Sequence, residues 1–249
     1  MENRYVMVTG SNRGIGSAVM RKFAANGYNI YAHARVASPE FDELTSSVRA
    51  EYGVEVEPVC FDLTDSEGME AAMRGIIRGK KGLDVLVNNA GVMHSGLFQM
   101  TELETVRRVF DVNLFAVMEL TQWALKIMVR KKHGSIVNLS SITGLDLGPG
   151  QCAYGVSKAA VAAFTQTLAS EVRNYGIRVN AVAPGIADTR MADEPQVQQE
   201  RARLEASKSP LSRLAEPQEI ADAVWYLASE QASFVTGQVL RVDGGNRLV

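Results

Sequence analysis

Cysteine and histidine are scarce in this chain of 249 residues, which contains two cysteines, Cys60 and Cys152, and three histidines. Two isolated thiols suit a reducing compartment and exclude a framework of several disulfides. None of the histidines stands at ligand spacing from either cysteine, so the sequence indicates no metal site. The simplest expectation for location is the cytoplasm.

Long apolar runs and a charge imbalance are also missing. No uninterrupted apolar stretch reaches about 18 residues, so we expect no membrane partner. The segment MENRYVMVTG lacks the apolar run and small-residue cleavage site of a signal peptide. The 26 basic residues against 28 acidic ones give a net charge of −2. This balance offers no electrostatic reason to expect nucleic acid as a partner.

Short β-rich runs recur along the whole chain and alternate with longer segments of helical composition. Several of these runs are almost entirely apolar, as buried parallel strands are. The predicted strands are Tyr5–Val8, Asn29–Ala32, Val54–Cys60, Val85–Val87, Ser135–Leu139, Arg178–Ala183 and Val239–Val242. This alternation predicts an α/β fold with one doubly wound, seven-stranded parallel sheet. Without a linker or repeat, residues 1–249 are expected to form a single domain.

Local signals predict where several helices begin. Ser38-Pro39 has the pattern of an N-cap followed by the first helical residue, and Pro217 opens a late helix. Thr64 to Glu67 and Thr101 to Glu104 both fit the capping box. The least regular stretch, 185–217, is interpreted either as a mobile substrate lid or as an ordinary surface helix with loops.

A glycine-rich turn follows the first predicted strand and precedes a helix. It reads Thr9-Gly10-Ser11-Asn12-Arg13-Gly14-Ile15-Gly16. Glycines at such a turn let main-chain amides approach a pyrophosphate at a helix N-terminus. The GxxxGxG spacing differs from the common dinucleotide fingerprint, and a plain strand-to-helix connection is the alternative. The position in the first strand–helix unit favours nucleotide binding in a Rossmann domain.

The residues after the second strand favour NADP over NAD. An NAD site usually carries a carboxylate there, about 20 residues after the glycine turn, to bind the ribose hydroxyls. Here the segment Tyr31–Arg35 has none and ends in a guanidinium. Arg35 and Arg13 together suit a 2′-phosphate, because arginine binds phosphate through paired hydrogen bonds. Two solvated surface arginines are the alternative.

Tyr154 and Lys158 stand four residues apart at the start of a predicted helix, Ala153–Tyr175. That spacing places both side chains on one helix face. A nearby ammonium favours the phenolate, so the pKa of Tyr154 is expected to fall toward working pH. Such a tyrosine can protonate a carbonyl oxygen or accept a proton from an alcohol.

Ser141 follows a predicted strand and therefore lies at the edge of the sheet where ligands bind. Its hydroxyl can orient a substrate oxygen, or it can serve as a turn residue. The surrounding Leu139-Ser140-Ser141-Ile142 is not the GxSxG of a hydrolase. A hydrolytic serine is therefore disfavoured.

Taken in order, these motifs resemble those of the short-chain dehydrogenases/reductases. The matching positions are Thr9–Gly16, Asp62, Asn88-Asn89-Ala90-Gly91, Asn113, Ser141, Tyr154, Lys158, Pro184-Gly185 and Thr189. The resemblance implies that Tyr154 is the general acid/base, and that Lys158 holds the nicotinamide ribose. Ser141 would orient the substrate carbonyl, and Asn113 would support a proton relay.

The same resemblance implies an NADP site along the chain. Its residues would be Gly10, Asn12, Arg13, Gly14, Ile15, Gly16, Arg35, Asp62, Leu63, Asn89, Ala90, Gly91, Tyr154, Lys158, Ala187 and Thr189. Asn88–Gly91 can equally be a structural turn between strands. Ser141, Gln151 and Tyr154 would contact the substrate.

Within the family, the sequence is most similar to 3-oxoacyl-[acyl-carrier-protein] reductases of fatty acid biosynthesis, through Gly150-Gln151 and the Pro210–Pro217 motif. It departs from them at Ala153 and Tyr175, so the reaction type is clearer than the substrate. The basic run Arg130-Lys131-Lys132-His133 either meets an acidic carrier protein or is a solvated helix end.

Two other functions stay open on the sequence. One is a secondary-alcohol dehydrogenase acting on a steroid, sugar or polyol. The other is a non-catalytic NADP-sensing protein, since fold does not determine function. The helices within Thr101–Lys132 and Ala153–Tyr175 carry apolar residues on more than one face, so we expect a homotetramer. These residues are Phe110, Leu114, Val117, Leu120, Trp123, Val161, Phe164 and Leu168.

Overall fold

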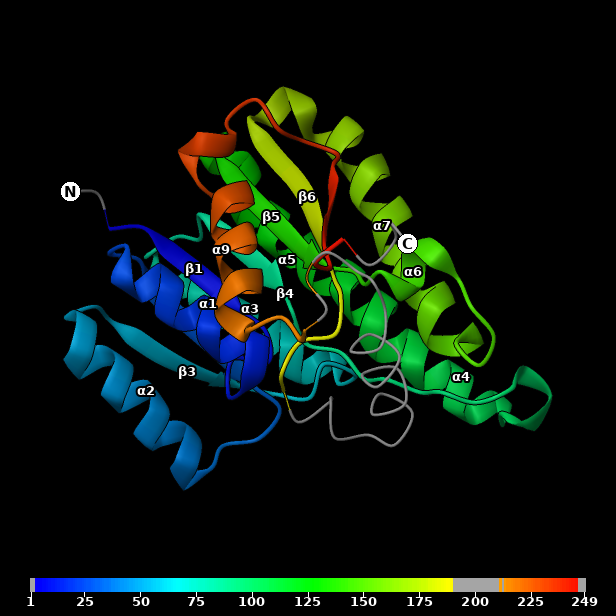
Figure 1. The fold of residues 1–249 in the computed structure, drawn as a ribbon. Helices are drawn as coiled ribbons and strands as arrows, with labels where there is room; N and C mark the ends of the chain where they lie inside the picture. The colour runs from blue at the N-terminus through cyan, green and yellow to red at the C-terminus, as the bar shows by residue number, and fades with distance from the viewer. Residues whose placement is uncertain (1–2, 190–210, 212, 246–249) are drawn as a thin grey trace.

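The computed structural model describes residues 3–189, 211 and 213–245, and its described part forms one seven-stranded sheet (Figure 1). All strands are parallel and follow the order β3-β2-β1-β4-β5-β6-β7. Their bounds are β1 Tyr5–Val8, β2 Asn29–Ala34, β3 Val56–Cys60, β4 Val85–Asn88, β5 Gly134–Leu139, β6 Ile177–Pro184 and β7 Val239–Val242. The predicted doubly wound α/β fold is confirmed, with strand ends displaced by at most two residues.

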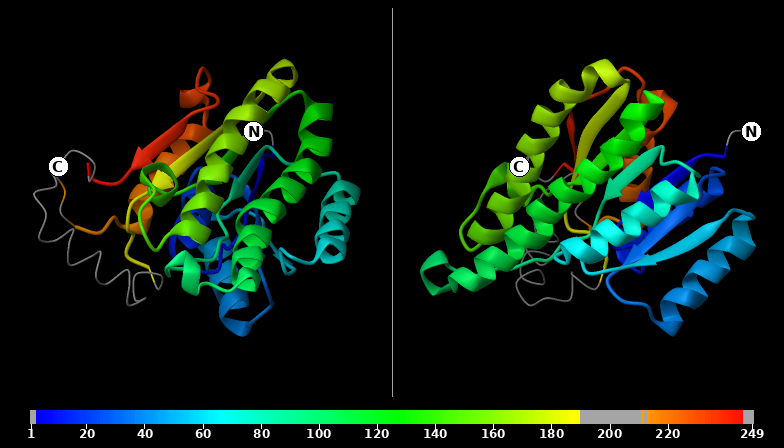
Figure 2. Two further views of the ribbon diagram at one scale, coloured as in Figure 1. Left: turned by 90° about the vertical axis from the view of Figure 1, so that its right-hand side faces the viewer. Right: turned by 180° about the vertical axis from the view of Figure 1, so that it is seen from behind.

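Helices cover both faces of the sheet, as Figures 1 and 2 show. One layer contains α1 (Gly14–Ala25), α2 (Pro39–Tyr52) and α9 (Pro217–Ala228). The opposite layer contains α3 (Ser66–Gly79), α5 (Ala116–Lys131) and α7 (Cys152–Val172). In β1, Val6 and Val8 pack in the first core, and Tyr5 and Met7 pack in the second. Since successive strand residues point to opposite faces, a fully apolar strand supplies both cores.

Two of the four predicted helix starts are correct. Ser38 accepts a hydrogen bond from the Phe41 main-chain N–H and caps α2, and Pro217 opens α9. The other two predictions are wrong. Asp65 rather than Thr64 caps α3, because its carboxylate reaches the Gly68 N–H. Glu102 precedes α4 (Leu103–Phe110), while the Thr101 hydroxyl bonds the Leu97 carbonyl instead.

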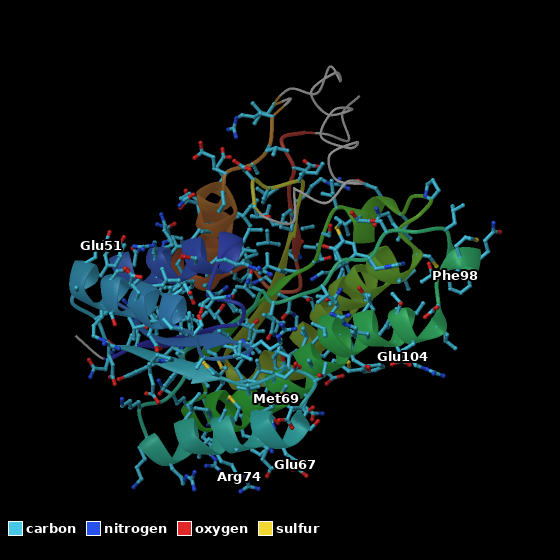
Figure 3. All side chains as sticks on the ribbon, turned by 90° about the horizontal axis from the view of Figure 1, so that it is seen from below. Glu51, Glu67, Met69, Arg74, Phe98 and Glu104 are labelled. Atoms are coloured by element: carbon cyan, nitrogen blue, oxygen red, sulfur yellow. The ribbon has the colours of Figure 1, made fainter. Side chains whose placement is uncertain are left out.

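Helix α4 continues through a π-helical turn, η2 (Asp111–Phe115), into α5. Among the described residues this run, Leu103–Lys131, is the one helix long and apolar enough to cross a membrane by length and composition. It is a core helix, because Leu120, Ala124 and Met128 pack under the sheet. The short helix η1 (Phe98–Met100) precedes α4. Its Phe98 is exposed, beyond the N-terminus of α4 (Figure 3).

The chain reverses its winding direction between β1 and β4, which lie side by side in the sheet. The connection after β1 enters the α1 layer, and the connection after β4 enters the α5 layer (Figure 2). Such a reversal leaves a crevice at the carboxyl ends of the strands, where ligands bind in open α/β sheets. The short helix α6 (Thr143–Asp146) lies beside it. Most of the expected lid, residues 190–210 and 212, lies outside the described residues.

Candidate active site

A cleft of about 2020 Å³ opens at the carboxyl ends of the strands and collects almost every residue that the sequence singled out. From the expected cofactor site it is lined by Gly10, Asn12, Arg13, Gly14, Ile15, Gly16, Arg35, Asp62, Leu63, Asn89, Ala90, Gly91, Ala187 and Thr189. Ser141, Gln151, Tyr154 and Lys158 line it as well. Asn113 is buried behind the lining. Residues up to 179 positions apart thus share one cleft.

The glycine turn has the backbone that a dinucleotide requires. Gly10 and Gly14 have φ values of +66° and +51°, in the left-handed region that other residues avoid. A Cβ on Gly16 would lie 2.1 Å from the Gly10 carbonyl oxygen. The turn therefore closes tightly only with glycine at these positions. The N-terminus of α1, which begins at Gly14, faces the cleft and suits an anionic pyrophosphate.

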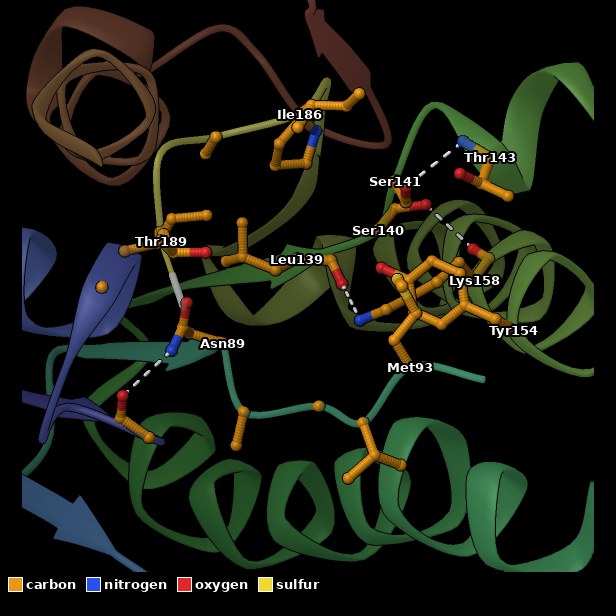
Figure 4. Close-up of a pocket in the computed structure, with 18 of the residues that line it drawn as sticks. Asn89, Met93, Leu139, Ser140, Ser141, Thr143, Tyr154, Lys158, Ile186 and Thr189 are labelled. Atoms are coloured by element: carbon orange, nitrogen blue, oxygen red, sulfur yellow. Dashed lines mark hydrogen bonds between the residues drawn. The ribbon is translucent and has the colours of Figure 1, made fainter. Parts of the chain in front are cut away.

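The Asn88–Gly91 turn ties neighbouring strands together while it lines the cleft. The Asn89 side-chain amide donates to the carbonyls of Thr9 and Gly10 at 2.8 and 3.3 Å (Figure 4). The Thr9 hydroxyl accepts hydrogen bonds from the main-chain N–H groups of Asn89 and Ala90. The structural reading of this turn is therefore correct, and it is compatible with a role in lining a cofactor site.

Charged side chains gather at the end of the cleft beyond β2 and β3. Arg13 and Arg35 are exposed there. Asp62 accepts hydrogen bonds from the main-chain N–H and hydroxyl of Thr64, and these bonds lower the pKa of its carboxyl. The positive charge of Arg35 lowers this pKa further. The Asp62 carboxylate is thus held by its own loop, and the guanidiniums face solvent.

Lys158 is almost fully buried and donates a hydrogen bond of 2.7 Å to the carbonyl oxygen of Leu139 (Figure 4). Burial lowers the pKa of Lys158 to about 8. Its ammonium nitrogen also lies beside Gly91, where a Cβ would approach it to 3.3 Å. The lysine therefore connects α7, β5 and the turn after β4.

The expected lowering of the Tyr154 pKa is wrong for this structure. Burial raises the pKa of Tyr154, and a hydrogen bond with Ser141 opposes this rise. The Lys158 nitrogen is 6.0 Å from the centre of the tyrosine ring and is directed to Leu139 instead. The phenol of the protein alone is therefore held protonated, which is the form that donates a proton.

Ser141 lies directly beyond β5, on the same side of the cleft as Tyr154. Its hydroxyl accepts a hydrogen bond from the Thr143 main-chain N–H at 3.2 Å (Figure 4). The neighbouring Ser140 hydroxyl donates to the Lys158 carbonyl at 2.9 Å and holds this segment against α7. Two serines thus have separate tasks, since Ser140 anchors the loop and Ser141 presents a hydroxyl to the cleft.

Asn113 occupies the π-helical turn η2 and is fully buried. Its Nδ2 donates to the Val92 carbonyl at 2.9 Å and to the Ser157 hydroxyl at 3.1 Å, and its Oδ1 accepts from the Val92 N–H. Its side chain therefore holds the loop after β4 against α7. A π-turn inside a helix is frequent at functional sites.

The structure adds lining residues that the sequence analysis did not identify as binding residues. The cleft is also lined by the apolar residues Val92, Met93, Leu97, Ile142, Leu147, Ile186 and Leu211. The Gln151 side chain donates to the Ser95 hydroxyl, and its Oε1 is buried without a hydrogen-bond partner among the described residues. His33 also lines the cleft. In the sequence, the signal that could have identified His33 as a lining residue was its position near the end of a buried strand.

Comparisons with known proteins agree on one family. A family model described as enoyl-(acyl carrier protein) reductase matches residues 10–247. The chain is 37% identical over 246 residues to the 3-oxoacyl-[acyl-carrier-protein] reductase FabG of Thermotoga maritima, with 98% of each chain covered. It is 38% identical over 247 residues to an acetoacetyl-CoA reductase of an Acinetobacter species, again with 98% of each covered.

Solved structures extend the similarity over the whole chain. A short chain dehydrogenase/reductase family protein is 34% identical, with a TM-score of 0.83 and complete coverage of both chains. A putative gluconate dehydrogenase from Agrobacterium tumefaciens is 30% identical, with a TM-score of 0.91. The match covers 99% of this chain and 96% of that one.

Proposed function

Because the chain belongs to the short-chain dehydrogenase/reductase family and is therefore an NAD(P)-dependent oxidoreductase, we propose that it reduces 3-oxoacyl thioesters with NADPH. One observation carries the choice of substrate class. Three apolar side chains on different loops, Met93, Leu97 and Leu147, line the cleft together with polar residues such as Ser95 and Gln151. We take the apolar side chains as a surface for an acyl chain, because the hydroxyls of a polyol need hydrogen-bond partners.

The exposed Arg13 and Arg35 support NADPH as the cofactor. Both line the cleft on the side of β2, where the ribose of the adenosine is expected. The side chains on β2 at this edge offer no carboxylate to bind the free ribose hydroxyls. Paired guanidinium hydrogen bonds would hold a 2′-phosphate instead.

The residues of the cleft would then act on the substrate carbonyl as follows. The hydride for the carbonyl carbon would come from NADPH when it is bound. Tyr154 donates its phenolic proton to the carbonyl oxygen, which becomes the alcohol. Ser141 donates a hydrogen bond to that oxygen and keeps it within reach of Tyr154. Lys158, held by Leu139, presents its ammonium to the ribose hydroxyls and orients the cofactor.

The tyrosine in its resting state suits the reductive direction. Burial raises the pKa of Tyr154, so the phenol carries its proton at neutral pH. Proton donation therefore needs no prior ionisation, whereas alcohol oxidation requires the phenolate.

We further propose that an acidic carrier protein can present the acyl group to this protein. Lys131 in the basic run pairs with the buried Asp84 at 2.5 Å, and it is therefore used within the fold. Arg130, Lys132 and His133 are exposed and stay available to an acidic partner. An acyl group on a carrier protein and the same group on a small thiol are thus both substrates to test.

A substrate panel tests the proposed function. Turnover of NADPH is measured with a 3-oxoacyl thioester, first on a small thiol and then on an acidic carrier protein. The reverse reaction is measured with a polyol, a hexonate and a cyclic secondary alcohol. The proposal expects the thioesters to have the highest kcat/KM. A higher kcat/KM for a polyol or hexonate would contradict it and favour the dehydrogenase suggested by the structural similarity to a putative gluconate dehydrogenase.

A further inference from the structure

His33 lies near the end of β2, between the glycine turn and the end of β3, and is only 2% exposed. Its Nδ1 is 3.3 Å from the main-chain nitrogen of Gly10. Its Nε2 is 3.0 Å from the carbonyl oxygen of Phe61, the residue directly before Asp62. One imidazole therefore bridges two segments that line the same end of the cleft.

These two partners determine the form of the ring. A main-chain N–H can only donate, so Nδ1 accepts from Gly10. A carbonyl can only accept, so Nε2 carries the hydrogen and donates to Phe61. The neutral tautomer with the proton on Nε2 satisfies both, whereas the doubly protonated ring would lose the bond to Gly10. Burial lowers the pKa of His33 to about 4, which keeps this form at neutral pH.

The backbone of the same residue strengthens the bridge. The main-chain carbonyl of His33 accepts from the N–H and the hydroxyl of Ser11, at 2.9 and 3.1 Å. The ring also packs against Phe61, with centroids 4.4 Å apart. Consecutive residues of the glycine turn, Gly10 and Ser11, are thus both held by His33.

We propose that His33 is a positioning residue, which sets the spacing between the glycine turn and the Phe61–Leu63 segment and thereby shapes the site for the adenosine end of the cofactor. The Gly10 N–H is used by the imidazole, so the turn presents its other amides to the pyrophosphate. The inference rests on a nicotinamide dinucleotide in this cleft, but not on the choice between NADP and NAD.

Three substitutions separate the two hydrogen bonds of the ring. His33→Asn keeps an acceptor near the position of Nδ1, and His33→Gln keeps a donor near that of Nε2. His33→Leu removes both. The dissociation constants of NADPH and NADH are measured by nucleotide fluorescence without substrate. kcat and the KM of each cofactor are measured separately.

The positioning role predicts a specific order of effects. His33→Leu and His33→Gln remove the acceptor of the half-buried Gly10 N–H, so the turn loses this anchor and cofactor binding weakens at least about fivefold. His33→Asn restores affinity to within about threefold of wild type, because the acceptor is kept. The value of kcat at saturating cofactor stays within about twofold, since Tyr154 and Ser141 are untouched. Glu43→Gln, on the exposed face of α2 and outside the cleft lining, is the control and leaves both cofactor affinity and kcat unchanged.

Other outcomes would overturn the proposal. Equal affinity for the cofactor in wild type and in a folded His33→Gln would show that the Gly10 bond does not position the turn. A fall in kcat with unchanged cofactor affinity would place the effect elsewhere. Circular dichroism checks that each variant is folded, and the comparison of His33→Gln with His33→Asn decides the question if His33→Leu is not folded. Because both cofactors are measured, a preference for NADH would contradict the proposed NADPH specificity while leaving the role of His33 testable.

Discussion

The ammonium of Lys158 is bound 2.7 Å from the carbonyl oxygen of Leu139, the last residue of β5, and is 6.0 Å from the ring centre of Tyr154. The lysine is thus oriented by the end of a strand rather than by its helical neighbour four residues earlier. Burial raises the pKa of Tyr154, and a hydrogen bond with Ser141 opposes this rise. If the proposed function is right, Tyr154 with Ser141 would donate the proton, while Lys158 would hold the cofactor separately.

Replacing Tyr154 by Phe tests the proton donor. The ring is kept, but the transferable proton is lost, and general acid catalysis contributes roughly 10²–10⁴-fold. We expect turnover of a 3-oxoacyl thioester to fall by at least about 100-fold while NADPH still binds. Steady-state kinetics and nucleotide fluorescence measure the two quantities. Retention of more than about a tenth of the turnover would reject the role of Tyr154.

Replacing Arg35 by Ala tests the choice of cofactor. A hydrogen bond to a charged group contributes about 1.5–3 kcal/mol, so NADPH binding should weaken by that amount. NADH lacks the 2′-phosphate and should bind almost unchanged. Arg78→Ala on α3 is a control at an exposed arginine outside the cleft lining. Equal losses for the two cofactors would show that Arg35 has a structural role only.

The lowered pKa of His33 predicts that the free energy of unfolding decreases in acid. Its pKa is near 4 in the folded chain and 6.5 in the unfolded chain, so its neutral form favours folding above pH 6.5. This contribution, at most about 3 kcal/mol, is lost as pH falls from 6.5 toward 4. Asp62 and Arg35 are the charged groups beside it, and the Asp62 pKa is already lowered. Urea unfolding at pH 7 and pH 4.5 should show a smaller loss in His33→Asn than in wild type, and equal losses would contradict this reading.

Arg178 should stabilise the end of α9. This half-buried guanidinium donates to the carbonyls of Leu227, Ala228 and Ser229 at 2.5, 2.9 and 3.0 Å. Arg178→Met would remove these donors and leave the Leu227 carbonyl only the longer bond from the Ser135 hydroxyl at 3.5 Å, so we expect a loss of about 2–4 kcal/mol in the free energy of unfolding.

A surface pair provides the comparison for Arg178. Arg74 forms an exposed ion pair with Glu70 one helical turn away, so Arg74→Met should cost less than about 1 kcal/mol. Thermal and urea unfolding measure both variants. Similar losses in the two would mean that the contacts of Arg178 do not stabilise the helix end.

The tetramer stays a prediction, and the structure narrows the surface that would form it. Four of the eight apolar residues behind this prediction are buried within one chain, namely Val117, Leu120, Val161 and Leu168. The others, Phe110, Leu114, Trp123 and Phe164, are only half-buried, and Phe115, Met118 and Val156 beside them are exposed. The exposed parts of these side chains are expected to pack against a second copy.

Light scattering at micromolar concentration tests the assembly. We expect about four times the 27.1 kDa of one chain. Phe115→Glu puts a charge on the 56% exposed ring and should lower the mass. Phe98→Glu is the matched control, because Phe98 is also exposed but lies beyond the N-terminus of α4, at the opposite end of this helix from Phe115 (Figure 3). A wild-type mass of a single chain would refute the prediction.

The sheet and the order of the cleft residues could be predicted from the sequence because their determinants are local. Buried parallel strands need continuous apolar runs, and β1 and β7 match their predicted bounds. The Gly10 and Gly14 positions follow from a turn that needs positive φ. The carboxyl ends of parallel strands share one edge, so Ser141 could be placed on the same edge of the sheet as the glycine turn before any geometry was known.

The remaining properties of the site depend on contacts between distant segments. The pKa of Tyr154 rises because packing removes water from its phenol, and the partner of Lys158 is a strand end 19 residues away. His33 acquires its role only where β2 brings it against Gly10 and Phe61. Sequence spacing determines which residues can meet along one element, whereas desolvation and hydrogen-bond partners are decided by the tertiary structure.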